Sequence, residues 1–505
     1  MMITYNMATY VPNCTGNGLC ASVGGCNAQL EGPPPVDTFA PTSLDTDQWV
    51  DVMIEYGAKY GVLVIQHCSG FSMFETNEFV LNATGFNYTY GVEFASWGGG
   101  KRDVMREFVD SCKRKGVQPA VYYSLNHNWY LNAASSVVQP GPLKPGQVSV
   151  TQKQYEAIAL AQYTALLTRY GDLAEVWFDG GMDHLPGFSD LIRKAQPHAG
   201  YFGGTVAGGA NVRWVGTESG TPAYPVWSTA ATYAAAGAGT PGGAIFNPAE
   251  VDTTLYAIDH WFWSPSPGFK IRSLAELVDV YHHSVGSNGG LLMNLTPDMS
   301  GKVPDEHRAR LKAAGDFVEK CYGTAVASTS GQGSQLKLEP LAASVDRIML
   351  EEDQAQGERI TAYTLLNAAT GATLGNGTAV GHKRIQLLAA PVAAGRDHRA
   401  ARRRLARHAR RRPIRRLRPR ALRGVVVRTT LAITKRGRTH VFMAPLPHWA
   451  PTHDTRDTRA REVPSVRCSA DATRQVHALG IHSAEHSLHS FLCSFQCCCW
   501  CSGQQ

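Results

Sequence analysis

The chain has 505 residues, with 48 Lys and Arg against 41 Asp and Glu and a hydrophobic content of 44%. This length allows a core domain of about 250 residues and a second domain, and the composition excludes both a short disulfide-stabilised miniprotein and a disordered chain of low hydrophobicity. The net charge of +7 is uneven: residues 396–505 hold 23 basic and 6 acidic residues, whereas residues 1–395 hold 25 and 35. The body is therefore acidic and the tail basic, and function has to be sought in the body.

Between residues 47 and 320, short apolar runs alternate with segments of helical periodicity, which is the pattern of repeated βα units around a parallel sheet. The helix expected over 101–115 is typical, because Val104, Phe108, Val109 and Cys112 share one face and Gly116 follows as a stop. About eight strands over about 320 residues match a (β/α)8 barrel, with a doubly wound sheet as the alternative. The expected strands are Ile3 to Tyr5, Val62 to Ile65, Val117 to Tyr123, Ala174 to Phe178, Tyr201 to Thr205, Val212 to Val215, His260 to Trp263 and Leu291 to Leu295. The other expected helices are Gln152 to Tyr170, Phe188 to Ala195, Ser273 to Ser284 and Asp305 to Lys320.

From Gln335 to Leu388 the pattern changes to short alternating strands separated by turns, which indicates the start of a β-sandwich. We therefore expect a catalytic barrel over 1–325 with a truncated first strand, a partial, galactose-binding-like β-sandwich over 326–394, and an Arg/His/Cys-rich tail over 395–505. The tail holds fifteen Arg and no Lys between residues 396 and 428. Such an amino-acid sequence is typical of a shifted reading frame or of a disordered extension. The alternative, which we do not favour, is an arm that binds nucleic acid.

Two carboxylates stand where a barrel carries its chemistry, at the C-terminal ends of strands. Asp179 follows the strand AEVWF, and Glu218 follows RWVGT. A retaining glycosidase uses one carboxylate as nucleophile and a second as acid and base. Neighbouring aromatic residues stack on sugar faces and raise the pKa of a carboxyl by desolvation. For either residue in isolation, a helix N-cap or a turn is the alternative role.

Several longer segments resemble the α-L-fucosidases of glycoside hydrolase family 29, particularly the plant and bacterial branch. The resemblance runs in consistent order from residue 36 to residue 323, through DTFAPTSLDTDQWVDVMIEYGAKYGVLVIQHCSGF, RDVMREFVDSCKRKGVQPAVYYS, YGDLAEVWFDGG, RWVGTESG, NPAEVD, HWFW and SLAELVDVYHHSVGSNGGLLMNLTPDMSGKVP. Two further segments, VDRIMLEEDQAQGERITAYTL and GHKRIQLL, resemble the β-sandwich that follows the barrel in many members. The resemblance ends at about Ala394.

The resemblance implies roles for individual residues. Asp179 would be the nucleophile and Glu218 the acid/base, with no metal or organic cofactor. His67 matches the first histidine of the family's His-His-Asp-Gly-Phe loop, which hydrogen-bonds the sugar hydroxyls. The remaining expected site residues, which would line the sugar pocket, are Glu250, Trp261 and Trp263.

Two positions depart from the family pattern. Thr4 stands where the first strand of the family carries a sugar-binding histidine, and Cys68 replaces the second histidine of the His-His loop. Each lost hydrogen bond costs about 0.5–1.5 kcal/mol, which weakens the case for fucose in particular. Cys68 is expected to fill space as a small apolar residue, with a reactive thiol as the alternative. A loop with partial disulfide bonding is expected at Cys14, Cys20 and Cys26, with metal binding as the alternative.

The sequence thus predicts an exo-acting retaining α-L-fucosidase that removes terminal fucose from oligosaccharides or glycoconjugates. The alternatives are a glycosidase of the same fold acting on another sugar and a catalytically weak carbohydrate-binding relative. Family members are generally secreted or lysosomal and vacuolar, which agrees with Asn-x-Ser/Thr acceptors at Asn13, Asn82, Asn87 and Asn376. The chain as given has neither a signal peptide nor an apolar run of ~18 residues, so no membrane partner is expected. The oligomeric state cannot be derived from the sequence.

Overall fold

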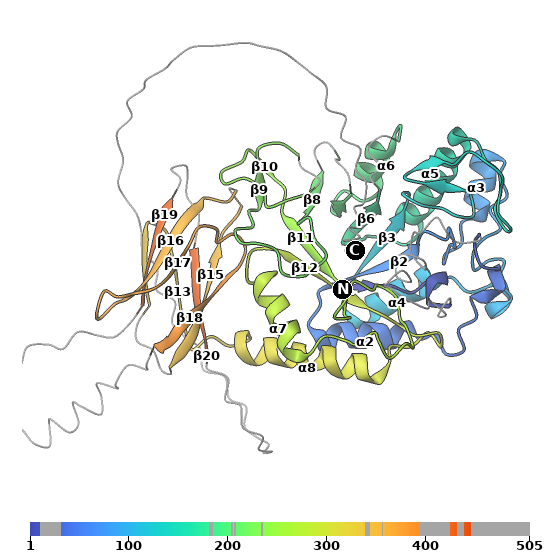
Figure 1. The fold of residues 1–505 in the computed structure, drawn as a ribbon. Helices are drawn as coiled ribbons and strands as arrows, with labels where there is room; N and C mark the ends of the chain where they lie inside the picture. Colours follow the sequence, from blue (N-terminus) through green and yellow to red (C-terminus); the bar gives the residue numbers. More distant parts are fainter. Residues whose placement is uncertain are drawn as a thin grey trace, which may run out of the picture. The chain divides into compact units, whose positions relative to one another are not determined.

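The computed structural model describes residues 1–10, 32–180, 185–203, 206, 209–233, 236–338, 344–355 and 357–392, and the backbone of residues 425–431 and 439–445. Eight parallel strands close into a barrel, in which each strand pairs with its neighbour in chain order and the last pairs with the first (Figure 1). These strands are β1 Met2–Ile3, β2 Tyr60–Gln66, β3 Gln118–Ser124, β6 Glu175–Asp179, β7 Gly200–Phe202, β8 Ala210–Trp214, β11 Ala249–Thr253 and β12 Gly290–Leu295. The expected (β/α)8 barrel is confirmed.

Helices cover the outside of the barrel between most consecutive strands. Among the described residues no helix joins β7 to β8 or β8 to β11; the latter connection instead carries the short antiparallel pair β9 Thr229–Ala230 and β10 Ile245–Phe246. A second short pair, β4 Ala133–Ala134 and β5 Val137–Val138, follows β3. The α-helices are α2 Thr46–Tyr56, α3 Asn77–Thr84, α4 Val104–Lys115, α5 Gln152–Arg169, α6 Phe188–Ala195, α7 Leu274–His283 and α8 Asp305–Tyr322; the 3-10 helices are η1 Met7–Tyr10, η2 Val36–Thr38 and η3 Trp97–Gly100.

The helix α4 shows how local sequence sets these boundaries. Its N-cap Asp103 accepts a hydrogen bond from the backbone N–H of Arg106 at 2.9 Å, which satisfies one of the free donors of the first turn. Gly116 ends the helix with φ 72°, a left-handed conformation that glycine adopts without strain. Between these ends, Phe108 and Cys112 are fully buried on the predicted face.

One expected strand is wrong. The seventh strand is β11, whose five residues are all buried, whereas His260 to Trp263 form no helix or strand. The aromatic run HWFW has the composition of a strand, but its side chains pack individually: the ring of His260 stacks on Phe269 at 4.1 Å between ring centres. Tertiary packing overrides strand propensity there.

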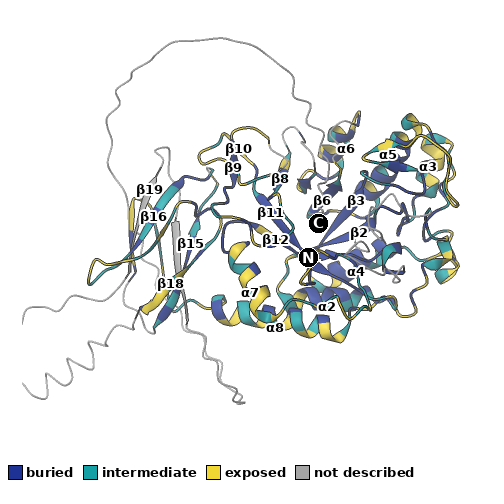
Figure 2. Ribbon diagram, viewed as in Figure 1, coloured by how far each residue is buried: buried dark blue, intermediate teal, exposed yellow. Residues whose placement is uncertain are grey.

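The barrel core has two layers. Inside the barrel, Met2, Val62, Tyr122 and Trp177 belong to one apolar cluster. A larger cluster fills the space between the strands and the surrounding helices. The barrel strands are accordingly buried while the outer faces of the helices are exposed (Figure 2). The described residues contain no helix that is long and apolar enough to cross a membrane.

A β-sandwich follows the barrel, and it extends beyond the boundary at residue 394 that composition suggests. One sheet has the order β13, β20, β15, β18 and the other the order β14, β19, β16, β17, so that two strands from the basic tail lie inside the sheets. The strands are β13 Ala327–Gly331, β14 Gln335–Leu338, β15 Val345–Glu352, β16 Ile360–Asn367, β17 Thr373–Gly377, β18 Arg384–Val392, β19 Val425–Leu431 and β20 Thr439–Pro445. Residues 393–424, which hold most of the arginine run, lie outside the described residues, as do residues 446–505.

Candidate active site

Asp179 is the last residue of β6, at the C-terminal end of the barrel. Its backbone carbonyl accepts hydrogen bonds from the backbone N–H groups of Leu125 and Asn126, both at 3.0 Å. Gly180 follows with φ 97°, and a Cβ there would approach the backbone nitrogen of Asn126 to 2.8 Å. A glycine is therefore required directly after Asp179 to let the two loops meet.

The carboxylate of Asp179 has one specific partner. The hydroxyl of Tyr122 donates a hydrogen bond to Oδ2 of Asp179 at 2.6 Å. Burial raises the pKa of Asp179, and the hydrogen bond from Tyr122 opposes that rise because it stabilises the ionised form. Tyr122 is itself fixed between two rings, Trp177 at 5.0 Å and His67 at 5.7 Å between ring centres. The hydroxyl is thus held against the carboxylate by packing.

Unpaired polar atoms gather beside Tyr122, on the loops that follow β2 and β3. Among the described residues, Nδ1 of His67, Nδ1 of His127 and Nε1 of Trp129 are buried without a hydrogen-bond partner. Burial, with His127 as the next cause, lowers the pKa of His67 to about 3, so its ring is neutral near pH 7. Buried polar groups normally have hydrogen-bond partners, so three neighbouring unpaired nitrogen atoms indicate a place where a polar ligand completes the hydrogen bonding.

Two contacts connect the residues that carry these atoms. The backbone N–H of Trp129 donates to the carbonyl of Cys68 at 2.9 Å, which joins the two loops, and the ring of Phe262 meets His67 edge-on at 5.1 Å between ring centres.

Cys68 is disulfide-bonded, so it is neither the expected apolar filler nor a reactive thiol. Cys112 and Cys321 are free. Residues 14, 20 and 26 lie outside the described residues.

Glu218 lies in the loop that follows β8. The indole N–H of Trp261 donates to Oε2 of Glu218 at 3.1 Å. Burial, followed by the charges of Asp252 and Asp259, raises the pKa of Glu218 to about 8. A carboxyl in this state is protonated at neutral pH, as a general acid must be. Besides burial, the charges of Asp179 and, more weakly, Glu218 both raise the pKa of Tyr122, so the two carboxyls lie in the same part of the barrel, although only Asp179 is hydrogen-bonded to the hydroxyl.

Thr4 does not offer its hydroxyl to a ligand. Oγ1 of Thr4 donates to the carbonyl of Trp261 and accepts from Nδ2 of Asn294 at 2.7 Å. The same Nδ2 also donates to the carbonyl of Trp261 at 3.1 Å. Thr4 and Asn294 therefore hold the backbone of the residue whose indole contacts Glu218.

The structure does not bring Glu250 to this cluster. Glu250 is the second residue of β11, and its carboxylate accepts hydrogen bonds from Tyr60 at 2.8 Å and Trp177 at 2.9 Å inside the barrel. Side chains on one face of a strand recur every second residue, so the carboxylate that reaches the neighbourhood of Glu218 is Asp252, two residues on. Trp263 is half-buried, and among the described residues no hydrogen bond or ring contact joins it to Asp179 or Glu218.

The residues that sequence reasoning missed are Tyr122, His127, Trp129, Asp252 and Phe262. Strand β3 pairs with β6 so that Ser124 lies opposite Asp179. Tyr122, two residues before Ser124, therefore points to the same face as Asp179. This register could have indicated Tyr122 as a site residue. No comparable signal marks His127 or Trp129, because loop conformation alone brings them to the site.

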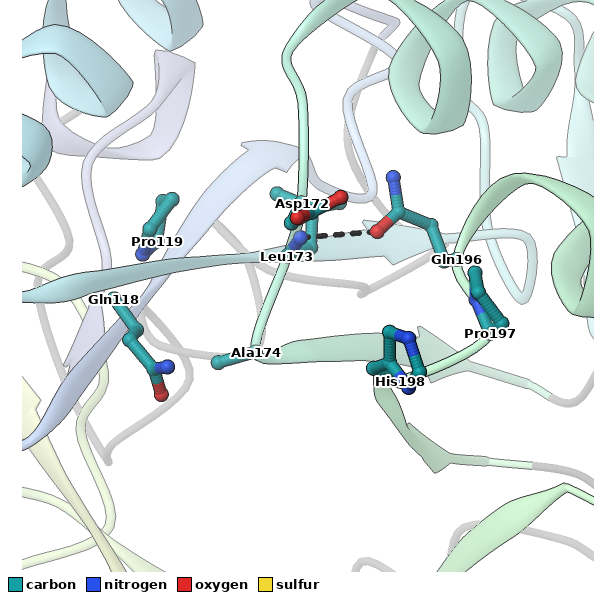
Figure 3. A pocket seen from close by; sticks show the side chains of 8 residues that line it. All are labelled: Gln118, Pro119, Asp172, Leu173, Ala174, Gln196, Pro197 and His198. Carbon is teal, nitrogen blue, oxygen red and sulfur yellow. Dashed lines mark hydrogen bonds between the residues drawn. The ribbon is translucent and has the colours of Figure 1, made fainter.

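A cavity of about 250 Å³ lies at the opposite end of the barrel and is a different feature. Residues that line it include Gln118, Ala174 and His198, at or before the first residues of β3, β6 and β7 (Figure 3). Its amide Gln196 is already paired, because Oε1 accepts from the N–H of Leu173 at 2.9 Å. Barrel enzymes place their chemistry at the C-terminal end, so we do not regard this cavity as the site. In the described part of the chain, no group of three or more His, Cys, Asp or Glu residues could hold a metal ion.

Comparison with known proteins shows the family that the chain resembles. The sequence model of the family described as Alpha-L-fucosidase matches residues 31–323. Alpha-L-fucosidase 1 of Arabidopsis thaliana is 30% identical over 288 residues, which cover 53% of this chain and 50% of that protein. The match thus spans half the length of this curated relative.

Solved structures agree with the fold. A crystal structure from Bacteroides thetaiotaomicron, described as a candidate alpha-L-fucosidase, superposes with a TM-score of 0.70 at 27% identity and covers 88% of this chain and 96% of that one. A Ruminococcus gnavus GH29 fucosidase solved in complex with fucose superposes with a TM-score of 0.64 at 16% identity, over 88% of this chain and 92% of that one. The second likeness shows the fold alone.

Proposed function

This chain belongs to the alpha-L-fucosidase family, and we propose that it is an exo-acting α-L-fucosidase that hydrolyses terminal fucose from oligosaccharides or glycoconjugates with retention of configuration. The observation that carries the proposal is the pair of unlike carboxyls around Tyr122. Asp179 receives a hydrogen bond that favours its ionised form, whereas Glu218 has a pKa of about 8. A double displacement requires one carboxyl that attacks in its ionised form and a second that donates a proton.

In the first step, an oxygen of Asp179 attacks the anomeric carbon of the fucosyl group. The bond from that carbon to the glycosidic oxygen breaks, and the protonated carboxyl of Glu218 gives its proton to the departing oxygen. A fucosyl ester of Asp179 and the free aglycone alcohol result. The hydrogen bond from Tyr122 favours the ionised form of Asp179 and orients the carboxylate for the attack.

In the second step, a water molecule attacks the same carbon. Glu218, now ionised, accepts the proton of this water, and the ester bond to Asp179 breaks. Fucose leaves with its original α configuration after two inversions, and both carboxyls return to their starting states. The Trp261 indole N–H favours the ionised form of Glu218 in this half of the cycle.

The unpaired atoms of His67, His127 and Trp129 are the proposed partners of the sugar hydroxyls. Fucose is a 6-deoxy sugar, so part of its surface is a methyl group that an aromatic wall can accommodate. Phe262, which packs edge-on against His67, supplies an apolar ring beside this cluster.

One observation keeps another sugar as the second candidate. The side chains of Thr4 and Cys68, at the two departures from the family pattern, are both engaged within the protein, in hydrogen bonds and in a disulfide respectively. Neither can replace the hydroxyl contacts of a histidine. A related hexose or deoxy sugar, or sugar binding with weak turnover, remains the alternative that a substrate panel separates from the proposal.

We also propose that the protein is secreted or resides in a lysosomal or vacuolar compartment. The disulfide at Cys68 is typical of an oxidising environment, and the sequon asparagines Asn82, Asn87 and Asn376 are exposed. Glycosidase treatment of the protein secreted from a eukaryotic host, followed by mass spectrometry, tests this point. Unmodified sequons together with a reduced Cys68 would contradict it.

The test of the activity uses the full chain, because β19 and β20 contribute to the sandwich. We expect release of 4-nitrophenol from its α-L-fucoside, and expect proton NMR during the first turnovers to show α-fucose before mutarotation. Initial β-fucose would contradict the retaining mechanism. Absence of turnover by folded protein, with turnover of another glycoside, would favour the second candidate.

A further inference from the structure

The loop that carries Glu218 also contacts the β-sandwich. It runs from Val215 to Ser228, between β8 and β9, and contains no helix or strand other than one isolated bridge. Glu218 is the fourth residue of the loop, and several of its residues before Val226 are exposed. Such a segment needs external anchors to hold a side chain in one place.

The first anchor lies beside Glu218 and belongs to the barrel. Ser219 forms the isolated antiparallel bridge with Thr253, the last residue of β11. Gly220 is buried with φ 76°, and a Cβ at this position would approach the side chains of Thr253 and Val280 to 2.9 and 3.0 Å. Before Glu218, the backbone N–H of Val215 donates to the carbonyl of Glu250 at 2.9 Å, so the barrel holds the loop from Val215 as far as Gly220.

The second anchor is Tyr224, six residues after Glu218, and its partners belong to the β-sandwich. The hydroxyl of Tyr224 donates to the carbonyl of Ala379 at 2.8 Å. It accepts from the backbone N–H groups of Thr378 at 2.9 Å and Ala379 at 2.8 Å. The guanidinium of Arg384 lies over the ring, 4.1 Å from its centre. A single tyrosine thus makes three hydrogen bonds and a cation–π contact with the sandwich.

The third anchor ends the loop. The backbone N–H of Ser228 donates to Oε2 of Glu358 in the sandwich at 2.7 Å, and the side chain of Gln354 donates to Oγ of Ser228 at 2.7 Å. Asn288, in the barrel, joins the same network by donating to Oγ of Ser228 at 2.9 Å and to Oε1 of Glu358 at 3.3 Å. Burial of these polar groups makes the junction costly to break, because each would be left unpaired.

We propose that the β-sandwich positions the general acid of the reaction, and that Tyr224 is the positioning residue through which it acts. This inference rests on the proposed function of Glu218. Proton donation depends on sub-ångström placement of the acid relative to the leaving oxygen. The barrel fixes the loop only as far as Gly220, and the part that follows is held by the sandwich through Tyr224 and Ser228. Tyr224 touches neither carboxylate; it restrains the loop from the sandwich side.

The test compares two substrates that differ in their need for an acid. Tyr224→Phe keeps the ring and removes the three hydrogen bonds. For phenyl α-L-fucoside, a poor leaving group, we expect kcat/KM to fall about tenfold; for 4-nitrophenyl α-L-fucoside, which leaves without much protonation, we expect less than about a twofold change. The rate with the good leaving group also shows that the variant is folded.

The matched control is Tyr322→Phe, which removes another tyrosine hydroxyl at the junction of barrel and sandwich. That hydroxyl contacts Arg347 of the sandwich at 3.2 Å and is remote in the chain from the Glu218 loop. We expect equal, small effects on both substrates. If Tyr224→Phe behaves like Tyr322→Phe, or lowers both rates equally, the inference is wrong.

A double-mutant cycle separates this inference from the proposed function. In a Glu218→Gln background, which has no acid to position, we expect Tyr224→Phe to have no further effect on the phenyl glycoside. An undiminished effect in that background would overturn the inference. If Glu218→Gln itself leaves the phenyl glycoside rate unchanged in an active enzyme, the proposed role of Glu218 fails instead.

Discussion

Two pairs of carboxyls lie at opposite ends of the same barrel. At the C-terminal end, Asp179 and Glu218 are both partly exposed, Asp179 hydrogen-bonded to Tyr122 and Glu218 to Trp261. Toward the N-terminal end, Glu175 and Glu250 are buried to 3% and 2% exposure and lie against each other beneath Tyr60 and Trp177. Both pairs contain carboxyls whose pKa is raised by burial.

The difference between the pairs is access. A raised pKa indicates a buried carboxyl, but only a carboxyl at the open loops of the C-terminal end of the barrel can meet a substrate. The barrel interior between the pairs is filled by Tyr122 and Trp177, whose rings stack at 5.0 Å. We therefore assign chemistry to the first pair and a structural role to the second, and the following predictions test that division.

The largest effect is expected at Asp179. Asp179→Ala removes the atom that forms the covalent intermediate, so single-turnover release of 4-nitrophenol should fall by at least about a thousandfold. Azide should partly restore the rate and give the β-configured fucosyl azide, because the anion attacks from the face that Asp179 occupied. Retention of most of the activity would exclude Asp179 as the nucleophile.

A substrate-dependent effect is expected at Glu218. Glu218→Gln should lower kcat/KM by about a hundredfold for a poor leaving group and much less for 4-nitrophenol. Because the pKa of Glu218 is raised to about 8, the acid stays protonated through neutrality and is lost as the pH rises through about 8. The wild-type kcat/KM profile should therefore fall above pH 8, and this fall should disappear in the variant; its persistence would assign it to another group.

A smaller effect is expected at Tyr122. Tyr122→Phe removes the hydrogen bond at 2.6 Å that favours ionised Asp179. We expect about a tenfold loss of kcat/KM near neutral pH. Because the hydrogen bond lowers the pKa of Asp179, its removal should move the acid limb of the profile to higher pH. An unchanged acid limb would show that this limb belongs to a different carboxyl.

The smallest effect on catalysis is expected at the opposite end. Glu175→Gln should leave kcat/KM within about twofold, since Glu175 belongs to the buried pair. Burial and the charge of Glu250 raise the pKa of Glu175. The free energy of unfolding of the wild-type protein therefore falls as the pH rises above 4.5, the ordinary pKa of a glutamate.

The stability of this variant should therefore depend less on pH than that of the wild type. At pH 8 we expect Glu175→Gln to be more stable by about 1 kcal/mol, and near pH 4.5 to match the wild type. Chemical denaturation at both pH values measures the difference. A large loss of activity in a stable Glu175→Gln protein would contradict the division between the pairs.

Much of the fold could be predicted because the barrel repeats one pattern. Apolar runs marked seven of the eight strands, and chain order then placed Asp179 and Glu218 at the same end. The failures share a cause. The motif around Glu250 predicts a residue of the site, but Glu250 lies toward the N-terminal end of β11, and the charge that acts on Glu218 is that of Asp252, two residues further along the same face. The composition of His260 to Trp263 predicts a strand, although these residues pack as single side chains.

The other features that the sequence does not predict depend on contacts between residues far apart in the chain. The hydroxyl of Thr4 is engaged with Trp261 and Asn294, and Cys68 is held in a disulfide, so both departures from the family pattern have structural roles. Composition predicts a boundary near residue 394, whereas the sandwich sheets include the backbone of residues 425–431 and 439–445. The arginine-rich composition of residues 396–428 gives no sign that β19 and β20 pair with other strands in the two sheets.

The most direct test of the account is to trap the covalent intermediate. Wild-type protein is incubated with a 2-deoxy-2-fluoro-α-L-fucosyl donor that carries a good leaving group, and digested peptides are sequenced by mass spectrometry. We expect one fluorofucosyl adduct, on Asp179, with adduct formation slowed but not displaced in Glu218→Gln. An adduct on Glu218 or Glu250, or steady turnover of the donor without any adduct, would contradict the central claim.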